Sequence, residues 1–165
     1  MDILLFDTDF NKIVNNIDVR EVQELNRNTY SPGGGTSLYD AIGMSVENEL
    51  DFLAENPENR SDKTLCVILT DGEENSSRKF NREKIKMMIS EMEEQFKWDF
   101  IFLAANQDAV LTAAGMGISA GKSMNWSADS EGISVAYASI SKATKLYRTS
   151  NQENYENIFK DSEDI

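Results

Sequence analysis

The sequence predicts an α/β fold in which helices cover both faces of a mostly parallel central sheet. Residues 65–70 (LCVILT) are apolar or β-branched without alternation, and residues 99–104 (DFIFLA) form a second, largely apolar run. Such runs are typical of strands that are buried on both faces of a parallel sheet. Segments with the helical spacing of apolar residues lie before, between and after them. Strands that alternate with helices in this way pack as layers around one core.

The first half of the chain predicts a hairpin followed by a helix. Residues 3–6 form a short apolar strand, residues 7–9 a turn, and residues 12–17 the returning strand. A polar, irregular segment over residues 18–31 follows. We expect three apolar side chains to anchor it: Val19, Val22 and Leu25. Residues 36–55 are predicted to be helical because these apolar side chains share one face: Leu38, Ile42, Val46, Leu50 and Leu53.

The middle of the chain predicts a strand, a helix, a second strand and a short helix. Residues 65–70 are expected to be the central strand of the sheet. The helix after Asn81 has an apolar stripe at helical spacing: Ile85, Met88, Ile89, Met92 and Phe96. After the strand at 99–104, a short helix begins at residues 106–108 and ends at Gly115 or Gly117, since glycine commonly follows the last helical turn.

The C-terminal part predicts an edge strand, a long helix and an acidic tail. The strand covers residues 122–126. Ser130 caps the helix, whose inward side chains are expected to be Ile133, Ala136, Tyr137, Ile140 and Tyr147. Residues 1–148 then form one domain, and residues 149–165 are an acidic tail. Within the tail, three apolar residues have the spacing of one helix face, so we expect them to dock on the domain: Tyr155, Ile158 and Phe159.

Composition excludes several classes of function. The formal net charge of −13 argues against binding to nucleic acids or to an anionic membrane surface. The absence of histidine excludes Ser-His-Asp and Cys-His catalysis and nearly all zinc sites. Any metal would be held by oxygen, which favours Mg²⁺, Ca²⁺ or Mn²⁺. The single cysteine, Cys66, allows no disulfide within the chain and favours a cytoplasmic location.

Two residues are candidate metal ligands. Asp71 follows the strand at 65–70, and ligands of parallel sheets bind where loops leave the carboxyl ends of the strands. Thr36 follows three glycines, Gly33 to Gly35, and opens a helix. Each residue also has a simpler explanation: Asp71 can shape a turn, and Thr36 can cap the helix.

The two motifs together, GGGT at 33–36 and LTDG at 69–72, resemble the von Willebrand factor A domain. The segment at 102–118 (FLAANQDAVLTAAGMGI) is similar to a bacterial and bacteriophage branch of that family. The resemblance covers residues 3–145 and implies a Rossmann-like layered fold. It also implies a non-enzymatic protein-interaction module in a bacterial cell or encoded by a phage. In such modules a divalent cation at a metal-ion-dependent adhesion site is completed by a carboxylate of the partner, and Thr36 and Asp71 match two of the three metal loops.

The chain departs from the family at its N-terminus. No D-x-S-x-S motif, which forms the first metal loop, precedes Thr36. By resemblance, the first strand, that loop and the first helix are lacking, so the domain is truncated and its metal site incomplete. We therefore expect weak or absent binding of Mg²⁺, Ca²⁺ or Mn²⁺. We also expect a protein partner or a second copy to cover the place of the missing central strand.

Two other functions remain open. The run ILLFDTD at 3–9 resembles the D-x-D motif of haloacid-dehalogenase-type, magnesium-dependent phosphatases, in which Asp7 would be the nucleophile and Asp9 the general acid. A simple hairpin turn explains the same two residues. The third possibility is a purely structural phage or bacterial subunit. Of the three, the non-enzymatic interaction module is the prediction that follows best from the two motifs.

Overall fold

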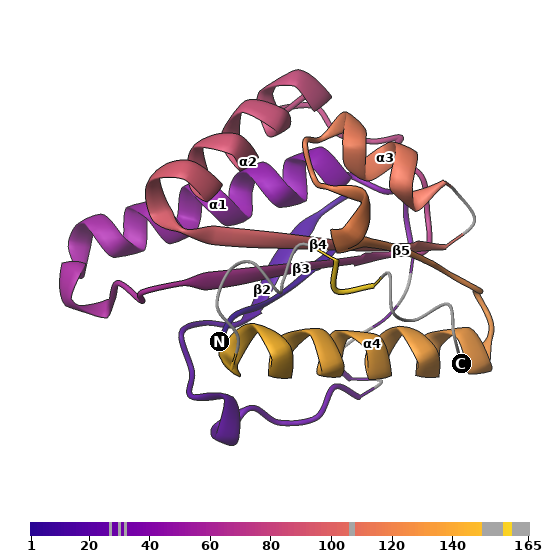
Figure 1. Cartoon of the computed structure of the whole chain (residues 1–165), viewed down its shortest axis with the longest axis horizontal. Coiled ribbons are helices and arrows are strands. Elements are labelled where there is room, and N and C mark those ends of the chain that lie inside the picture. The colour runs from indigo at the N-terminus through magenta and orange to yellow at the C-terminus, as the bar shows by residue number, and fades with distance from the viewer. Residues whose placement is uncertain (27, 30, 32, 106–107, 150–156, 160–165) are drawn as a thin grey trace. The chain divides into compact units, whose positions relative to one another are not determined.

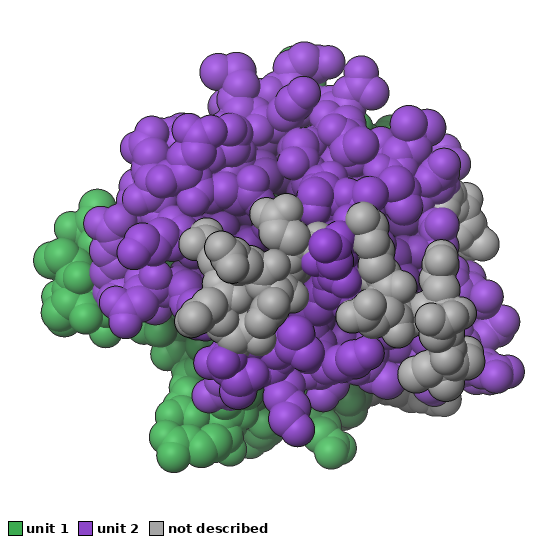
Figure 2. Space-filling view, viewed as in Figure 1, with its two compact units in different colours: residues 1–59, 74–81 green, residues 60–73, 82–165 purple. Residues whose placement is uncertain are grey.

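The computed structural model describes residues 1–165 apart from 27, 30, 32, 106–107, 150–156 and 160–165. The chain forms two compact units (Figure 2). Unit 1 comprises Met1–Asn59 and Glu74–Asn81, and unit 2 comprises Arg60–Glu73 and Arg82–Ile165. Each unit carries its own sheet. No helix in the described part of the chain is long and apolar enough to cross a membrane.

Unit 1 begins with an antiparallel hairpin of β1 (Ile3–Phe6) and β2 (Phe10–Val14). The strand predicted at 12–17 therefore starts two residues earlier than expected. A 3₁₀ turn, η1 (Val19–Glu21), follows. Val19 and Leu25 are 51% and 43% exposed, so the prediction that they anchor this segment was wrong. Hydrogen bonds between neighbours shape it instead: the Asp18 carboxylate accepts the N–H of Arg20 at 2.9 Å.

The long helix of unit 1 is α1 (Leu38–Glu55), followed by a 3₁₀ turn, η2 (Pro57–Asn59). Its N-cap position is Ser37, one residue after the predicted start at Thr36. The predicted stripe is buried in its first half, at Leu38, Ile42 and Val46. Gly43 allows the Phe80 ring of the Glu74–Asn81 segment to approach α1, because a Cβ there would lie 2.5 Å from that ring.

Unit 2 contains a three-stranded parallel sheet with the order β3-β4-β5. The strands are β3 (Thr64–Thr70), β4 (Trp98–Ala105) and β5 (Ser123–Trp126). Every residue of β4 is buried, as the apolar run predicted. The expectation that residues 65–70 form the central strand was wrong, because β3 lies at the edge of its sheet. β3 is also less covered than its apolar run predicted, since Ile68 and Thr70 are buried but Val67 is exposed. An apolar run does not indicate how many strands lie along the edges of a strand.

Helices lie on both faces of this sheet (Figure 1). On one face lie α2 (Arg82–Phe96) and α3 (Ala109–Gly115), and on the other lies α4 (Ser130–Thr149). A short 3₁₀ turn, η3 (Ala120–Lys122), precedes β5. The predicted stripe of α2 is buried at Ile85, Ile89 and Met92. On α4 the inward prediction is confirmed for Ala136 and Tyr147, which are buried, and was wrong for Tyr137, which is 56% exposed. Adjacent residues of a helix point about 100° apart, so Tyr137 cannot share the face of Ala136.

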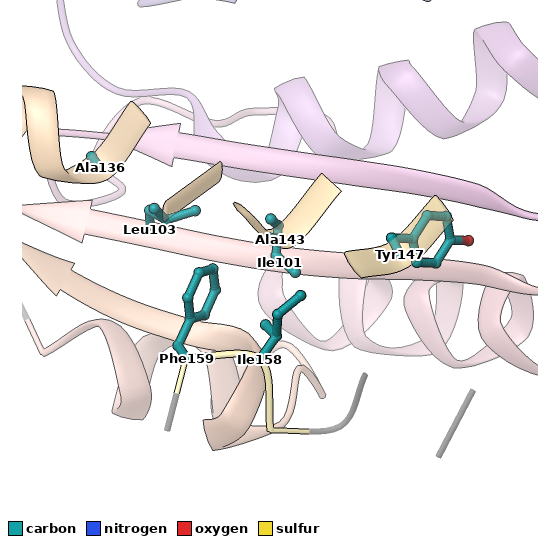
Figure 3. Close-up of a cluster of buried hydrophobic side chains, with 7 residues drawn as sticks. All are labelled: Ile101, Leu103, Ala136, Ala143, Tyr147, Ile158 and Phe159. Carbon is teal, nitrogen blue, oxygen red and sulfur yellow. The ribbon is translucent and has the colours of Figure 1, made fainter. Parts of the chain in front are cut away.

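The C-terminal segment contributes to the core of unit 2 (Figure 3). Ile158 and Phe159 are each 6% exposed, and the Phe159 N–H donates to the Gly121 carbonyl at 3.1 Å. Their side chains point toward the sheet and α4. Tyr155, the third expected docking residue, lies outside the described residues. The buried members of this cluster are Ile101, Leu103, Ala136, Ala143, Tyr147, Ile158 and Phe159.

Candidate functional site

The glycine-rich loop of unit 1 fixes the main chain of Thr36. The Thr36 N–H donates to the Asn75 side-chain oxygen at 2.8 Å, and the Thr36 carbonyl accepts the N–H groups of Asn75 and Ser76 at 3.0 and 3.2 Å. The contact is close enough to require glycine before it, since a Cβ on Gly35 would lie 2.1 Å from the Ser76 hydroxyl oxygen. Thr36 is thus held by its own unit, just before the N-cap of α1.

The first turn of α1 is capped by the Glu74–Asn81 segment. The Glu74 carboxylate accepts the N–H of Tyr39 at 2.9 Å and the N–H and hydroxyl of Ser77 at 2.8 and 2.7 Å. The Ser77 hydroxyl oxygen accepts the N–H of Asp40 at 3.0 Å. Helix N-termini bind anions because their first N–H groups lack partners. Here the N–H groups of Tyr39 and Asp40 already donate to side chains of unit 1.

Asp40, in the first turn of α1, in turn accepts hydrogen bonds from the Glu74–Asn81 segment. Its carboxylate accepts the N–H groups of Arg78, Lys79 and Phe80 at 2.8, 2.9 and 2.8 Å. Desolvation by burial raises the pKa of Asp40, but these three hydrogen bonds and the nearby Lys79 charge outweigh it, so the pKa lies below its ordinary value. Asp40 is therefore a structural carboxylate that orders the segment after Glu74, a role that the sequence did not indicate.

The DTD motif forms the hairpin turn between β1 and β2. The Asp7 carboxylate accepts the Asp9 N–H at 2.7 Å, the geometry of an Asx turn. The Asp7 carbonyl accepts the Ser37 N–H at 2.8 Å. Gly34, at φ +76°, passes so close that a Cβ would lie 2.6 Å from the Thr8 hydroxyl oxygen. This geometry is that of the turn, the simpler of the two explanations for Asp7 and Asp9.

Asp71 lies in unit 2, at the carboxyl end of β3 and exposed to solvent. The strand ends in a small turn in which the Thr70 hydroxyl donates to the Gly72 carbonyl at 3.0 Å. Thr36 belongs to unit 1, so the structure places the two predicted ligands in separate units. No group of three or more acidic or cysteine side chains that could hold a metal ion is present among the described residues. A hydroxyl and one carboxylate suit Mg²⁺ chemically but fill two of its six octahedral positions.

A buried ion pair in unit 2 was not predicted. The Lys122 ammonium lies 2.7 Å from the Asp99 carboxylate and 3.4 Å from that of Glu93, and the side chains of Lys122 and Asp99 are each 9% exposed. The signal in the sequence was an aspartate inside the apolar run WDFIF. Because a buried charge without a partner is costly, that aspartate implied a nearby cation. Lys122 therefore ties η3 to the start of β4 through Asp99 and to α2 through Glu93.

The outer edge of β3 is the most unusual feature of unit 2. β3 pairs with β4 on one side, and no strand pairs with its other side within the described residues. Its seven residues include no charge and no proline. Val67, between half-buried Leu65 and Leu69 on the same face, is 37% exposed. Natural sheets protect such edges with charges, prolines, bulges or a covering segment, and an edge without them can act as a template for pairing with another strand.

Comparison with protein-family models, with curated proteins and with solved structures finds no match to this chain.

Proposed function

We propose that this chain is a non-enzymatic protein-interaction module of the von Willebrand factor A type with an incomplete metal-ion-dependent adhesion site. The observation that carries the proposal is the unprotected edge of β3. A parallel strand of seven uncharged residues offers unpaired N–H and C=O groups along one side. Main-chain hydrogen bonds to an added strand supply affinity, and the side chains on alternate positions supply specificity.

A divalent cation has a secondary place in this proposal. The Thr36 hydroxyl and the Asp71 carboxylate are hard oxygen ligands for Mg²⁺, Ca²⁺ or Mn²⁺. Water and a carboxylate of the partner would complete the shell, so binding in the isolated chain is weak or absent. A bacterial or phage-encoded protein of the cytoplasm, with one cysteine and no disulfide framework, fits this role.

The test compares the β3 edge with another exposed site. Val67→Lys places a charge in the middle of the edge, and Val135→Lys places the same charge on α4, where Val135 is 52% exposed. We expect the parent chain at micromolar concentration either to self-associate or to bind a hydrophobic dye. Val67→Lys should reduce that property and Val135→Lys should not, by sedimentation velocity and dye fluorescence. A cooperative monomer that binds no dye would contradict the proposal.

A further inference from the structure

We propose that the occupant of the β3 edge is a second copy of this chain, paired antiparallel through β3 about a two-fold axis at Val67. This inference rests on the proposed interaction function and names its partner. The paired strands would join the two three-stranded sheets of the copies into one continuous sheet. Interfaces with this symmetry use the same surface on both subunits, so the strand must complement itself.

The sequence of β3 has that self-complementarity. It is TLCVILT, which has nearly the same pattern of residue types in both directions. In an antiparallel pair centred on Val67, residues that face each other project from the same side of the sheet. Pairs of β-branched residues and pairs of threonines are favourable in such positions. The facing pairs are Thr64 with Thr70, Leu65 with Leu69, Cys66 with Ile68, and Val67 with Val67 of the second copy.

The charges at the two ends of β3 also complement each other. Lys63 precedes the strand and Asp71 follows it, and both are exposed. The register centred on Val67 sets Lys63 of one copy opposite Asp71 of the other, twice in each dimer. The Lys63 ammonium lies over the Tyr147 ring, 4.8 Å from its centroid, and donates to the Tyr147 carbonyl, which holds that charge beside the amino end of β3. Pairing with Asp71 of the second copy therefore requires the ammonium to turn from Tyr147 toward the partner. A parallel pair would instead bring like charges together at both ends.

The overall charge sets the conditions for association. Each copy carries a formal charge of −13, which opposes dimerisation at low salt. Repulsion between exposed charges is screened beyond about 8 Å at physiological ionic strength. The apolar attraction offered by exposed Val67 and half-buried Leu65 and Leu69 acts at short range and is not weakened by salt. Physiological salt is therefore the condition for the measurement.

Engineered cysteines on the full chain test the register. Cβ atoms of facing residues lie about 4.5–5.5 Å apart, close to the separation that a disulfide spans. Under mild oxidation, Val67→Cys alone should form a covalent dimer. Leu65→Cys alone and Leu69→Cys alone should not, whereas a mixture of the two should. Cys66 can stay in place, since burial of its thiol raises its pKa to about 12 although the residue is half-buried overall. Val135→Cys is the matched exposed control.

A charge exchange gives a second, independent readout. Lys63→Glu should weaken dimerisation about fivefold, measured by sedimentation equilibrium. The double variant Lys63→Glu/Asp71→Lys should restore it, because the two signs are exchanged in both symmetric pairs. A parent chain that stays monomeric at about 100 µM, well above the range typical of stable dimers, with no Val67→Cys dimer, overturns the second-copy proposal. If Val67→Lys still lowers dye binding in that monomer, the edge remains a docking site for another protein and the proposed function stands. If Val67→Lys does not lower dye binding, the second-copy proposal and the proposed function are both overturned.

Discussion

Asp40 shows how one carboxylate can organise a loop that lies far from it in the sequence. It accepts three consecutive main-chain N–H groups, from Arg78 to Phe80, at 2.8–2.9 Å. Desolvation raises its pKa, and the hydrogen bonds lower it by more, so the folded value lies below the ordinary 3.8. A carboxyl group of this kind stabilises the fold above its unfolded pKa, and that contribution is lost as the pH falls through the folded value.

Asp40→Asn should lower the free energy of unfolding by about 1–2 kcal/mol at pH 7, because a neutral amide accepts fewer and weaker hydrogen bonds. Urea unfolding at pH 7 and near pH 3 measures this. The difference from the parent should shrink at the lower pH, because the carboxyl is largely protonated in the unfolded chain below its ordinary pKa of 3.8 and the stabilising contribution is lost from there downward. Asp51→Asn, at an exposed position of the same helix, is the control and should change little. An equal loss for both variants at both pH values would show that the Asp40 carboxylate is not special.

Residue-scale prediction from the sequence succeeded where a residue's own chemistry decides its position. The helical spacing of apolar side chains located Ile85, Ile89 and Met92 in the core. It failed where another segment decides. Glu74 caps the first turn of α1 from a position 35 residues away, and no local pattern announces such a partner. The same holds for Lys122, which the fold brings to Asp99.

At the scale of elements, the order and type of strands and helices followed the sequence closely, but the position of β3 in its sheet did not. The run at 65–70 and the run at 99–104 look alike, yet β4 is buried throughout and β3 has Val67 37% exposed. Burial of the faces of a strand favours apolar residues in its own sequence. Pairing along its edges depends instead on which strands the rest of the chain supplies.

The C-terminal segment is a second element whose role depends on packing. Ile158 and Phe159 are buried in one cluster with side chains of β4 and α4 (Figure 3). The sequence predicted their docking from a spacing of three and four residues, but the described residues at 157–159 form turns rather than a helix.

Phe159→Ala should therefore cost about 3 kcal/mol or more in the free energy of unfolding, because it removes a buried ring from the core of unit 2. Urea unfolding gives the magnitude. Increased binding of a hydrophobic dye would show that apolar surface around Ile101 and Leu103 has become exposed. Asn157→Ala, at an exposed neighbouring position, is the matched control. A loss below about 0.5 kcal/mol, the range of surface substitutions, would contradict a core role for this segment.

At the scale of the whole molecule, the two predicted metal ligands belong to different compact units. The sequence located both residues at the places its motifs implied: Thr36 directly before the N-cap of α1, and Asp71 directly after β3. Motif spacing gives the order of loops along the chain. It does not give the number of ligands that converge, because that depends on every loop that the fold brings to one place.

The last prediction concerns magnesium. The proposed ligands, one hydroxyl and one carboxylate, would leave four octahedral positions to water, and Mg²⁺ gives up its own water reluctantly. We expect the isolated chain to bind Mg²⁺ with a dissociation constant of about 1 mM or weaker, measured by isothermal titration calorimetry at physiological salt. The high negative charge attracts cations non-specifically, so the variants Asp71→Ala and Thr36→Val need a control. Asp62→Ala serves as that control, because Asp62 is an exposed acidic residue of unit 2, as Asp71 is. Whatever weak binding exists should fall with Asp71→Ala and Thr36→Val but persist in Asp62→Ala. A micromolar site that Asp71→Ala abolishes would contradict this prediction and would mean that other oxygens of this chain complete the coordination of the cation.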